Sequence, residues 1–96
     1  MSHLPKSSPR VIMYRRLDAI ALDVGAITAL QFSPNGKRLI SGHADGWVLI
    51  WDVSPFESKL KLRSPGRITR VLFLPDGRRF LVADAAGNIA LWALPD

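Results

Sequence analysis

ITALQFSPNGKRLISGHADGWVLIWD, residues 27–52, is followed 41 residues further along the chain by a second copy of the same pattern, ITRVLFLPDGRRFLVADAAGNIALWA, residues 68–93. Aligned without a gap, the two copies are identical at 9 of 26 positions. A fixed period between about 20 and 50 residues indicates a repeat architecture, in which one unit cannot bury its apolar face without a neighbour. With two copies in 96 residues, the chain is expected to need further units to cover its apolar faces.

Each copy predicts three short strands separated by tight turns. In the first turn, Pro34 fixes φ and the pair Asn35–Gly36 tolerates positive φ. The apolar runs between the turns are short and continuous, which is typical of strands buried between stacked sheets. Glycine or proline recurs every few residues, so no helix is expected. The expected strands are residues 26–32, 37–42 and 47–53 in the first copy and residues 67–74, 78–83 and 88–94 in the second.

The two copies differ in the segments that flank them. A fourth strand is expected at residues 60–62, after the first copy, whereas the second copy is followed by no equivalent segment. A matching short strand is expected before the first copy, at residues 18–22. We therefore divide the chain into a disordered basic tail, a closing strand with its turn, a four-stranded unit and a three-stranded unit. Their bounds are residues 1–15, 16–25, 26–66 and 67–96.

Composition excludes several classes of function. The chain has no cysteine, which excludes a disulfide framework as well as thiolate metal sites and thiolate catalysis. Its two histidines lack paired carboxylates, so neither a metal nor any other cofactor is expected. No apolar run approaches the roughly 20 residues of a membrane span, and no secretory signal is expected. Residues 1–16 carry four of the five net positive charges, so the repeat body is nearly neutral.

These turn and strand signatures resemble the WD-repeat family of β-propellers. In the first copy the resemblance lies in FSPNGK, LISG, ADG and VLIWD, at residues 32–37, 39–42, 44–46 and 48–52. In the second copy it lies in Phe73, PDG at residues 75–77, Gly87 and IALW at residues 89–92. The resemblance implies an all-β fold of two antiparallel propeller blades, with the second blade lacking its outer strand. It also implies a scaffold that binds proteins, in which residues 18–22 would be the strand that closes the ring.

Blades of this family usually contain a buried hydrogen-bond network of a histidine, a serine or threonine, a turn aspartate and a tryptophan. By this resemblance, the structural motif residues here are Ser41, Asp45, Trp51, Asp52 and Trp92. The family's Gly-His pair is missing, because no histidine follows Gly25 or Gly66. In the second copy Val82 replaces the serine and Ala86 replaces the turn aspartate. Both blades are therefore expected to be divergent, with Asp45 partly unpaired or exposed and both motif tryptophans packed in the core.

His43 lies between Ser41 and Asp45, and alternate residues of a strand share a face. A catalytic triad requires three such groups in one hydrogen-bonded chain, but this segment coincides with the family's turn motif. We therefore interpret His43 as a surface or turn histidine, and we expect no enzymatic activity.

Trp47 and a run of basic residues are the candidate partner-binding residues. Trp47 follows a turn where its repeat counterpart is Asn88, and an exposed tryptophan is a typical anchor for a protein partner. Lys59, Lys61 and Arg63 are expected to alternate on one face of the outer strand, which also discourages edge-to-edge aggregation. No aromatic residue is interleaved with these bases, so nucleic acid is an unlikely partner.

The sequence leaves three functions open. The first is a non-catalytic protein-interaction or scaffolding module of WD-repeat blades, whose copies form a trimer or tetramer and close a ring, or which combines with a complementing WD-repeat chain. The second is a truncated fragment of a larger propeller without autonomous function. The third is a nucleic-acid-associated accessory subunit that uses the basic tail. An intracellular location, cytoplasmic or nuclear, is expected, with no membrane association.

Overall fold

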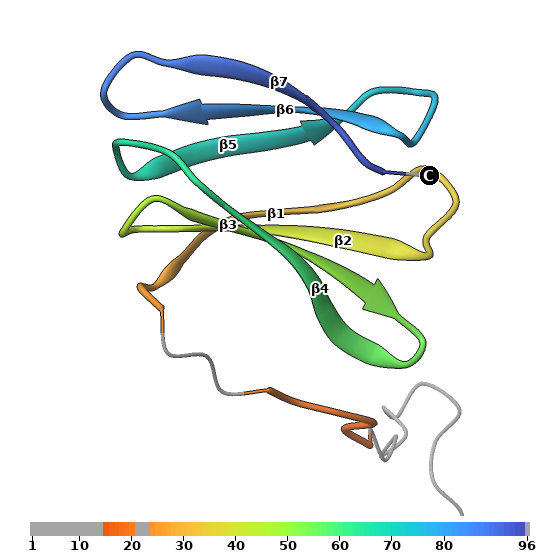
Figure 1. The fold of residues 1–96 in the computed structure, drawn as a ribbon. Helices are drawn as coiled ribbons and strands as arrows, with labels where there is room; N and C mark the ends of the chain where they lie inside the picture. Colours follow the sequence, from red (N-terminus) through yellow and green to blue (C-terminus); the bar gives the residue numbers. More distant parts are fainter. Residues whose placement is uncertain (1–14, 21–23, 96) are drawn as a thin grey trace, which may run out of the picture.

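The computed structural model describes residues 15–20 and 24–95. Within these residues the chain folds into seven strands that form two antiparallel sheets, stacked one on the other (Figure 1). The all-β architecture of two antiparallel blades, predicted from the repeat, is therefore confirmed. The predicted basic tail lies almost entirely outside the described residues.

The first sheet has four strands in the order in which they follow along the chain. Its strands are β1 (Ile27–Phe32), β2 (Arg38–His43), β3 (Trp47–Val53) and β4 (Phe56–Arg63). The register between β3 and β4 shifts at Ile50 and Trp51, where Ile50 pairs with Leu60 and Trp51 pairs with Ser58. Lys59 is therefore the extra residue of a β-bulge, a detail that period-2 patterning of the sequence does not reveal.

The second sheet has three strands in chain order. They are β5 (Ile68–Phe73), β6 (Arg79–Asp84) and β7 (Ile89–Ala93), so β7 is an edge strand within the described part of the chain. The second blade thus has three strands, as expected. Residues 15–20, which include the first part of the predicted closing strand, form no strand, and residues 21–22 lie outside the described residues.

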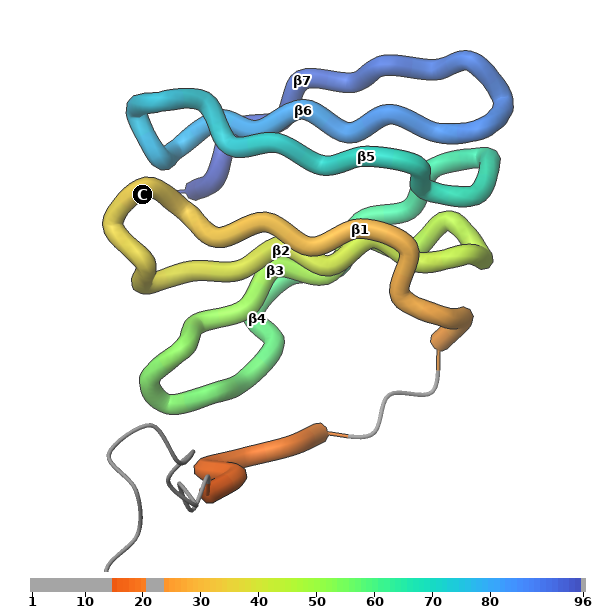
Figure 2. Tube along the Cα trace, turned by 180° about the vertical axis from the view of Figure 1, so that it is seen from behind, coloured from red at the N-terminus to blue at the C-terminus, as the bar shows by residue number. Residues whose placement is uncertain are grey.

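The two sheets approach each other closely where β1 and β2 meet β5. Gly42 makes this approach possible, because a Cβ atom on Gly42 would lie 2.3 Å from Cγ2 of Ile68. The Thr28 hydroxyl donates to the carbonyl oxygen of Ile68, which joins β1 to β5. Figure 2 shows β1 and β5 running side by side at this contact. A glycine and a threonine thus fix the distance between the sheets, and glycine in a strand commonly marks such a close approach.

The apolar core fills the space between the sheets. Nine buried side chains form it, with Ala29, Leu60 and Leu62 packed against them. The nine are Ile40, Val48, Ile50, Ile68, Val71, Phe73, Phe80, Val82 and Leu94. Both repeats contribute, so the core belongs to the pair of blades and neither blade could form it alone.

Each sheet buries one face on its neighbour and turns the other face outward. In the described segments, residues 15–20 and 24–95, no helix is long and apolar enough to cross a membrane. The outer faces and the β7 edge are the surfaces through which the two-blade unit can contact further blades or proteins.

Candidate functional site

The motif residues of the first blade meet in a buried chain of hydrogen bonds. The indole Nε1 of Trp51 donates to the Ser41 hydroxyl over 2.9 Å. The same hydroxyl lies 2.9 Å from Nε2 of His43, and Nδ1 of His43 lies 2.9 Å from the carbonyl oxygen of Gly25. None of these three side chains is more than 3% exposed. The chain of bonds therefore links β3, β2 and the segment before β1 through the interior of the blade.

The partners fix where the protons lie. The carbonyl of Gly25 can only accept, so Nδ1 of His43 carries the proton. In the neutral imidazole, Nε2 is then the acceptor, and the Ser41 hydroxyl donates to it while accepting from Trp51. Every polar group in the chain has a partner, which is the condition under which a buried polar network rigidifies a core.

The interpretation of His43 as a surface or turn histidine was wrong. His43 is fully buried and takes the place in the network that the sequence left empty. His43 lies at the end of β2, whereas in the family pattern the histidine follows the glycine that precedes β1. The signal that could have revealed it is the repeat itself, because the equivalent residue of the second copy, Asp84, is also polar and also buried.

The contact between Ser41 and His43 does not form a catalytic triad. The other ring nitrogen of His43 bonds to a backbone carbonyl, and Asp45 bonds elsewhere. The Ser41 hydroxyl is buried and already engaged with two groups. A nucleophile in that position has no access to a substrate, so the geometry gives the trio a structural role.

Asp45 is exposed, one of the two outcomes expected from the sequence, and it holds the turn between β2 and β3. Its carboxylate accepts from the backbone N–H groups of Gly25, over 2.9 Å, and Trp47, over 3.3 Å. Partial desolvation raises the pKa of Asp45, but these two N–H groups, with its own backbone N–H and the nearby His43, outweigh it, so the pKa lies below its ordinary value. Asp45 and His43 thus attach the same residue, Gly25, to the turn through its N–H and its C=O.

The second blade replaces this network with a carboxylate. Asp84 accepts from the backbone N–H groups of Ala86 and Asn88, each over 3.0 Å, and from the Asn88 side-chain amide. The N–H of Asn88 is the largest cause that holds the pKa of Asp84 below its ordinary value, against the effect of burial. The turn between β6 and β7 is therefore fixed by Asp84, a residue that the sequence comparison overlooked.

The two motif tryptophans differ in burial. Trp51 is 3% exposed, and the ring of Phe56 from β4 packs against it with centroids 5.3 Å apart. Trp92 occupies the same repeat position on β7 but is 38% exposed, so the expectation that it lies in the core was wrong. The cause is that no fourth strand lies beside β7 in the described residues, so no counterpart of Phe56 covers the ring.

Trp47 lies beneath two cations at the outer edge of the first blade. Its ring centroid is 5.0 Å from Cζ of Arg63 and 5.6 Å from Nζ of Lys61. Trp47 pairs with Arg63 across β3 and β4, which explains why the side chains meet. The sequence offered no aromatic residue between these bases, yet the fold supplies one from the neighbouring strand. The structure therefore brings together three of the four candidate partner-binding residues.

Lys59 is separated from this cluster by the β-bulge. Its ammonium group lies 2.8 Å from Glu57 and 3.8 Å from Asp52, and it has no ring contact. The hydrogen bond to Glu57 is the main cause that raises the pKa of Lys59. Asp52, a motif residue, also pairs with Arg38 over 3.8 Å. Lys59 and Asp52 thus belong to a local ion-pair group that ties β4 to β2 and β3.

The outer face of each blade exposes large apolar side chains. Leu30 and Phe32 lie on the face of the first blade that points away from the second. Their partners on β2, Ser41 and Leu39, alternate with Ile40 and Gly42, which face the second blade. On the second blade, Leu72 and Leu91 both pair with Leu81, and Ile89 pairs with Ala83, so these side chains share one outer face. The exposed fractions of the five side chains Leu30, Phe32, Leu72, Ile89 and Leu91 lie between 45% and 76%. Apolar faces of this kind normally mark a contact surface.

Comparison with known proteins places these blades in a family. The sequence pattern of the Vps8 β-propeller matches residues 12–95. The chain belongs to the Vps8 β-propeller family. The WD-repeat character inferred from the turn and strand signatures is confirmed by relatives that carry such repeats. The WD repeat-containing protein 26 homolog of Drosophila melanogaster is 48% identical over 33 residues, which are 34% of this chain and 5% of that protein.

Other relatives and a solved structure agree with this family assignment. Protein Mut11 of Chlamydomonas reinhardtii is 36% identical over 52 residues, which are 53% of this chain and 14% of that protein. The β-propeller domain of Cps50 (Swd1) from Myceliophteria thermophila superposes with a TM-score of 0.72 at 34% identity, over 78% of this chain and 23% of that domain. The Vps8 β-propeller chain described here therefore spans 5% and 14% of these two relatives and 23% of the Cps50 chain.

Proposed function

We propose that the chain is a non-catalytic protein-interaction module whose outer sheet faces pack against further propeller blades. The observation that carries the proposal is the pair of apolar outer faces at opposite ends of the two-blade stack, together with the open edge of β7. Within the described residues both faces keep large apolar side chains exposed, and repeat proteins bury such side chains by stacking the next unit on them. Family relatives are propellers as well, which supports blades as the natural occupants.

The size of these faces indicates how tightly copies of the chain would associate. Full burial of a large apolar side chain contributes about 1.5–3 kcal/mol, so the remaining exposed half of each side chain is worth about 1 kcal/mol. One outer face against the other would bring together two side chains from one copy and three from the next, a gain of about 5 kcal/mol. Association costs about 4–15 kcal/mol in lost freedom. Ring closure by copies therefore depends on concentration and on hydrogen bonds at the β7 edge.

Light scattering coupled to size-exclusion chromatography, over a wide range of concentrations, tests the proposal. Leu91→Glu places a charge on the outer face of the second blade, and Ala85→Glu is the matched control because Ala85 is exposed in the turn between β6 and β7. We expect a discrete trimer or tetramer that Leu91→Glu dissociates, that Ala85→Glu leaves intact and that deletion of residues 16–22 abolishes. A monomer at every concentration contradicts assembly by copies, and it leaves a blade-bearing partner or the rest of a larger propeller as the occupant.

The cluster of Trp47, Lys61 and Arg63 is the proposed anchor for a further partner, which the sequence first suggested. The ring already carries two cations, so a nucleic-acid base would have to displace them before it could stack. This arrangement supports a protein partner over nucleic acid. Intracellular location, cytoplasmic or nuclear, stays a prediction from the sequence.

A further inference from the structure

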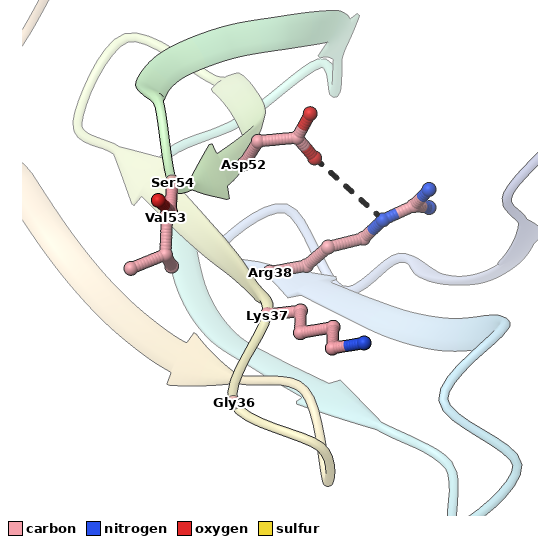
Figure 3. Close-up of a pocket in the computed structure, with 6 residues that line it drawn as sticks. All are labelled: Gly36, Lys37, Arg38, Asp52, Val53 and Ser54. Carbon is pink, nitrogen blue, oxygen red and sulfur yellow. Dashed lines mark ion pairs between the residues drawn. The ribbon is translucent and has the colours of Figure 1, made fainter.

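The turns that follow β1 and β5 lie against each other at the end of the stack opposite Asp45. A Cβ atom on Gly77 in the second turn would lie 3.5 Å from Cδ of Pro34 in the first. Between these turns is a groove of about 320 Å³, and beside it a second hollow of about 480 Å³ shares Lys37 and Arg38 (Figure 3). The groove is lined by Asn35, Lys37, Arg38, Asp76, Gly77, Arg78, Leu94 and Pro95.

The repeat concentrates positive charge in this groove. Each turn is followed by two cations, so the groove receives Lys37 and Arg38 from the first blade and Arg78 from the second. Its lining contains one acid, Asp76. Lys37 and Arg38 alone outnumber this acid among the lining residues, which makes the groove attractive to an anion.

The carboxylate of Asp76 is already engaged within its own turn. One oxygen accepts from the backbone N–H groups of Arg78 and Arg79, and the other accepts from Nε of Arg79 over 2.7 Å. The N–H of Arg78 is the largest cause that lowers the pKa of Asp76 to about 2, so the group is ionised at neutral pH and directed at Arg79. It therefore contributes little to neutralising the cations of the first blade.

The first turn differs because its Asn35, a neutral amide, stands at the repeat position that the acid Asp76 occupies in the second turn. Oδ1 of Asn35 accepts from the N–H of Lys37 and the hydroxyl of Ser33, which builds the same turn without a charge. The acid that pairs with Arg38 is Asp52, whose oxygen is 3.8 Å from Nε, beyond hydrogen-bond distance. In Figure 3 the terminal nitrogens of Arg38 extend past this contact. The guanidinium fork is therefore still open to a second anion.

The remaining walls are apolar but not aromatic. Leu94 and Pro95 line the groove, and Val53 lines the adjoining hollow. Without an aromatic ring in either lining, neither hollow offers a platform on which a nucleic-acid base would stack. A peptide with carboxylates beside apolar side chains fits both kinds of wall, since Arg and Lys pair with carboxylates.

We propose that this groove binds a linear acidic peptide segment, whose carboxylates pair with Lys37 and Arg38. The groove lies between two blades of one chain and away from both outer faces, so the proposal does not depend on what covers those faces. It would serve in an isolated chain and in an assembled propeller alike.

Fluorescence anisotropy with a fluorescein-labelled hexaglutamate peptide tests the proposal on the full chain at low salt. The double variant Lys37→Gln/Arg38→Gln removes two groove cations, and we expect its affinity to fall about tenfold or more, the loss expected for two charge-assisted contacts. The matched control Lys61→Gln/Arg63→Gln removes the same charge from the Trp47 cluster and should change the affinity less than about twofold, as expected for distant screened charges.

Asn35→Asp is a second test that keeps the turn, because Asp76 already builds the same turn in the second blade. The added acid should draw Arg38 away, as Asp76 draws Arg79, and weaken binding severalfold without loss of folding by circular dichroism. Equal losses in the groove variant and the control would show non-specific attraction and overturn the proposal. So would the absence of hexaglutamate binding, or tighter groove-dependent binding of a labelled single-stranded oligonucleotide.

Discussion

Replacing Ser41 with alanine would remove the central member of the buried network and leave two groups without partners. Nε1 of Trp51 and Nε2 of His43 each lie 2.9 Å from the Ser41 hydroxyl, and both side chains are almost completely buried. A buried polar group without a partner costs about 1–3 kcal/mol. The two groups together, with some relaxation of the histidine ring, should lower the free energy of unfolding by about 2–4 kcal/mol.

Urea unfolding at pH 7, followed by far-UV circular dichroism, measures this loss. The midpoint should fall while the slope with urea stays constant, because the surface exposed on unfolding does not change. Ser58→Ala is the matched control, since Ser58 is exposed on β4 opposite Trp51 and should shift the free energy by less than about 0.5 kcal/mol. Equal effects of the two substitutions would refute the reasoning that the network stabilises the blade.

Three further perturbations test other parts of the structure. Gly42→Ala places a Cβ atom 2.3 Å from Cγ2 of Ile68 and should lower the free energy of unfolding, measured by urea titration, by about 1–3 kcal/mol. An unchanged midpoint would contradict the close approach of the sheets. Phe56→Ala uncovers Trp51 and should shift tryptophan emission to longer wavelength with stronger acrylamide quenching, whereas an unchanged spectrum would contradict the ring packing. The pKa of Asp84 in the folded state is lowered, mainly by the N–H of Asn88. The ionised carboxylate therefore stabilises the folded chain fully above the unfolded pKa of about 3.9, and this stabilisation is lost as pH falls through the folded pKa. Asp84→Asn should therefore flatten the acid limb of a stability profile measured by urea midpoints, and an unchanged limb would contradict this role.

Much of the fold follows from the repeat. The 41-residue offset places every strand and turn of the second blade on its counterpart in the first, and the turn glycines and prolines mark the boundaries between strands. Ser41 and Trp51 were also predictable, because a strand serine and a strand tryptophan ten residues apart match the family pattern. These features depend on local sequence and on period, which a single chain displays.

The errors concern contacts that depend on register and on neighbouring strands. His43 was overlooked because its partner, Gly25, is 18 residues away and joins it only through the fold. Lys59 was expected to alternate on one face with Lys61 and Arg63, but a β-bulge changes which residues it contacts. Trp92 was assigned to the core because the sequence pattern matches that of Trp51, although burial requires a covering strand.

The central claim is that the two sheets stack as neighbouring propeller blades through the contact between Gly42 and Ile68. A nuclear Overhauser measurement on chain in which the γ2 methyl groups of all isoleucines, including Ile68, are ¹³C-labelled tests it most directly. The structure predicts a strong cross-peak between the Ile68 methyl and the α-protons of Gly42, alongside the contacts between Ile40 and Ile50 within the first sheet. Loss of the first cross-peak while the contacts within the sheet persist would contradict the stacking, and with it the two outer faces on which the proposed function rests.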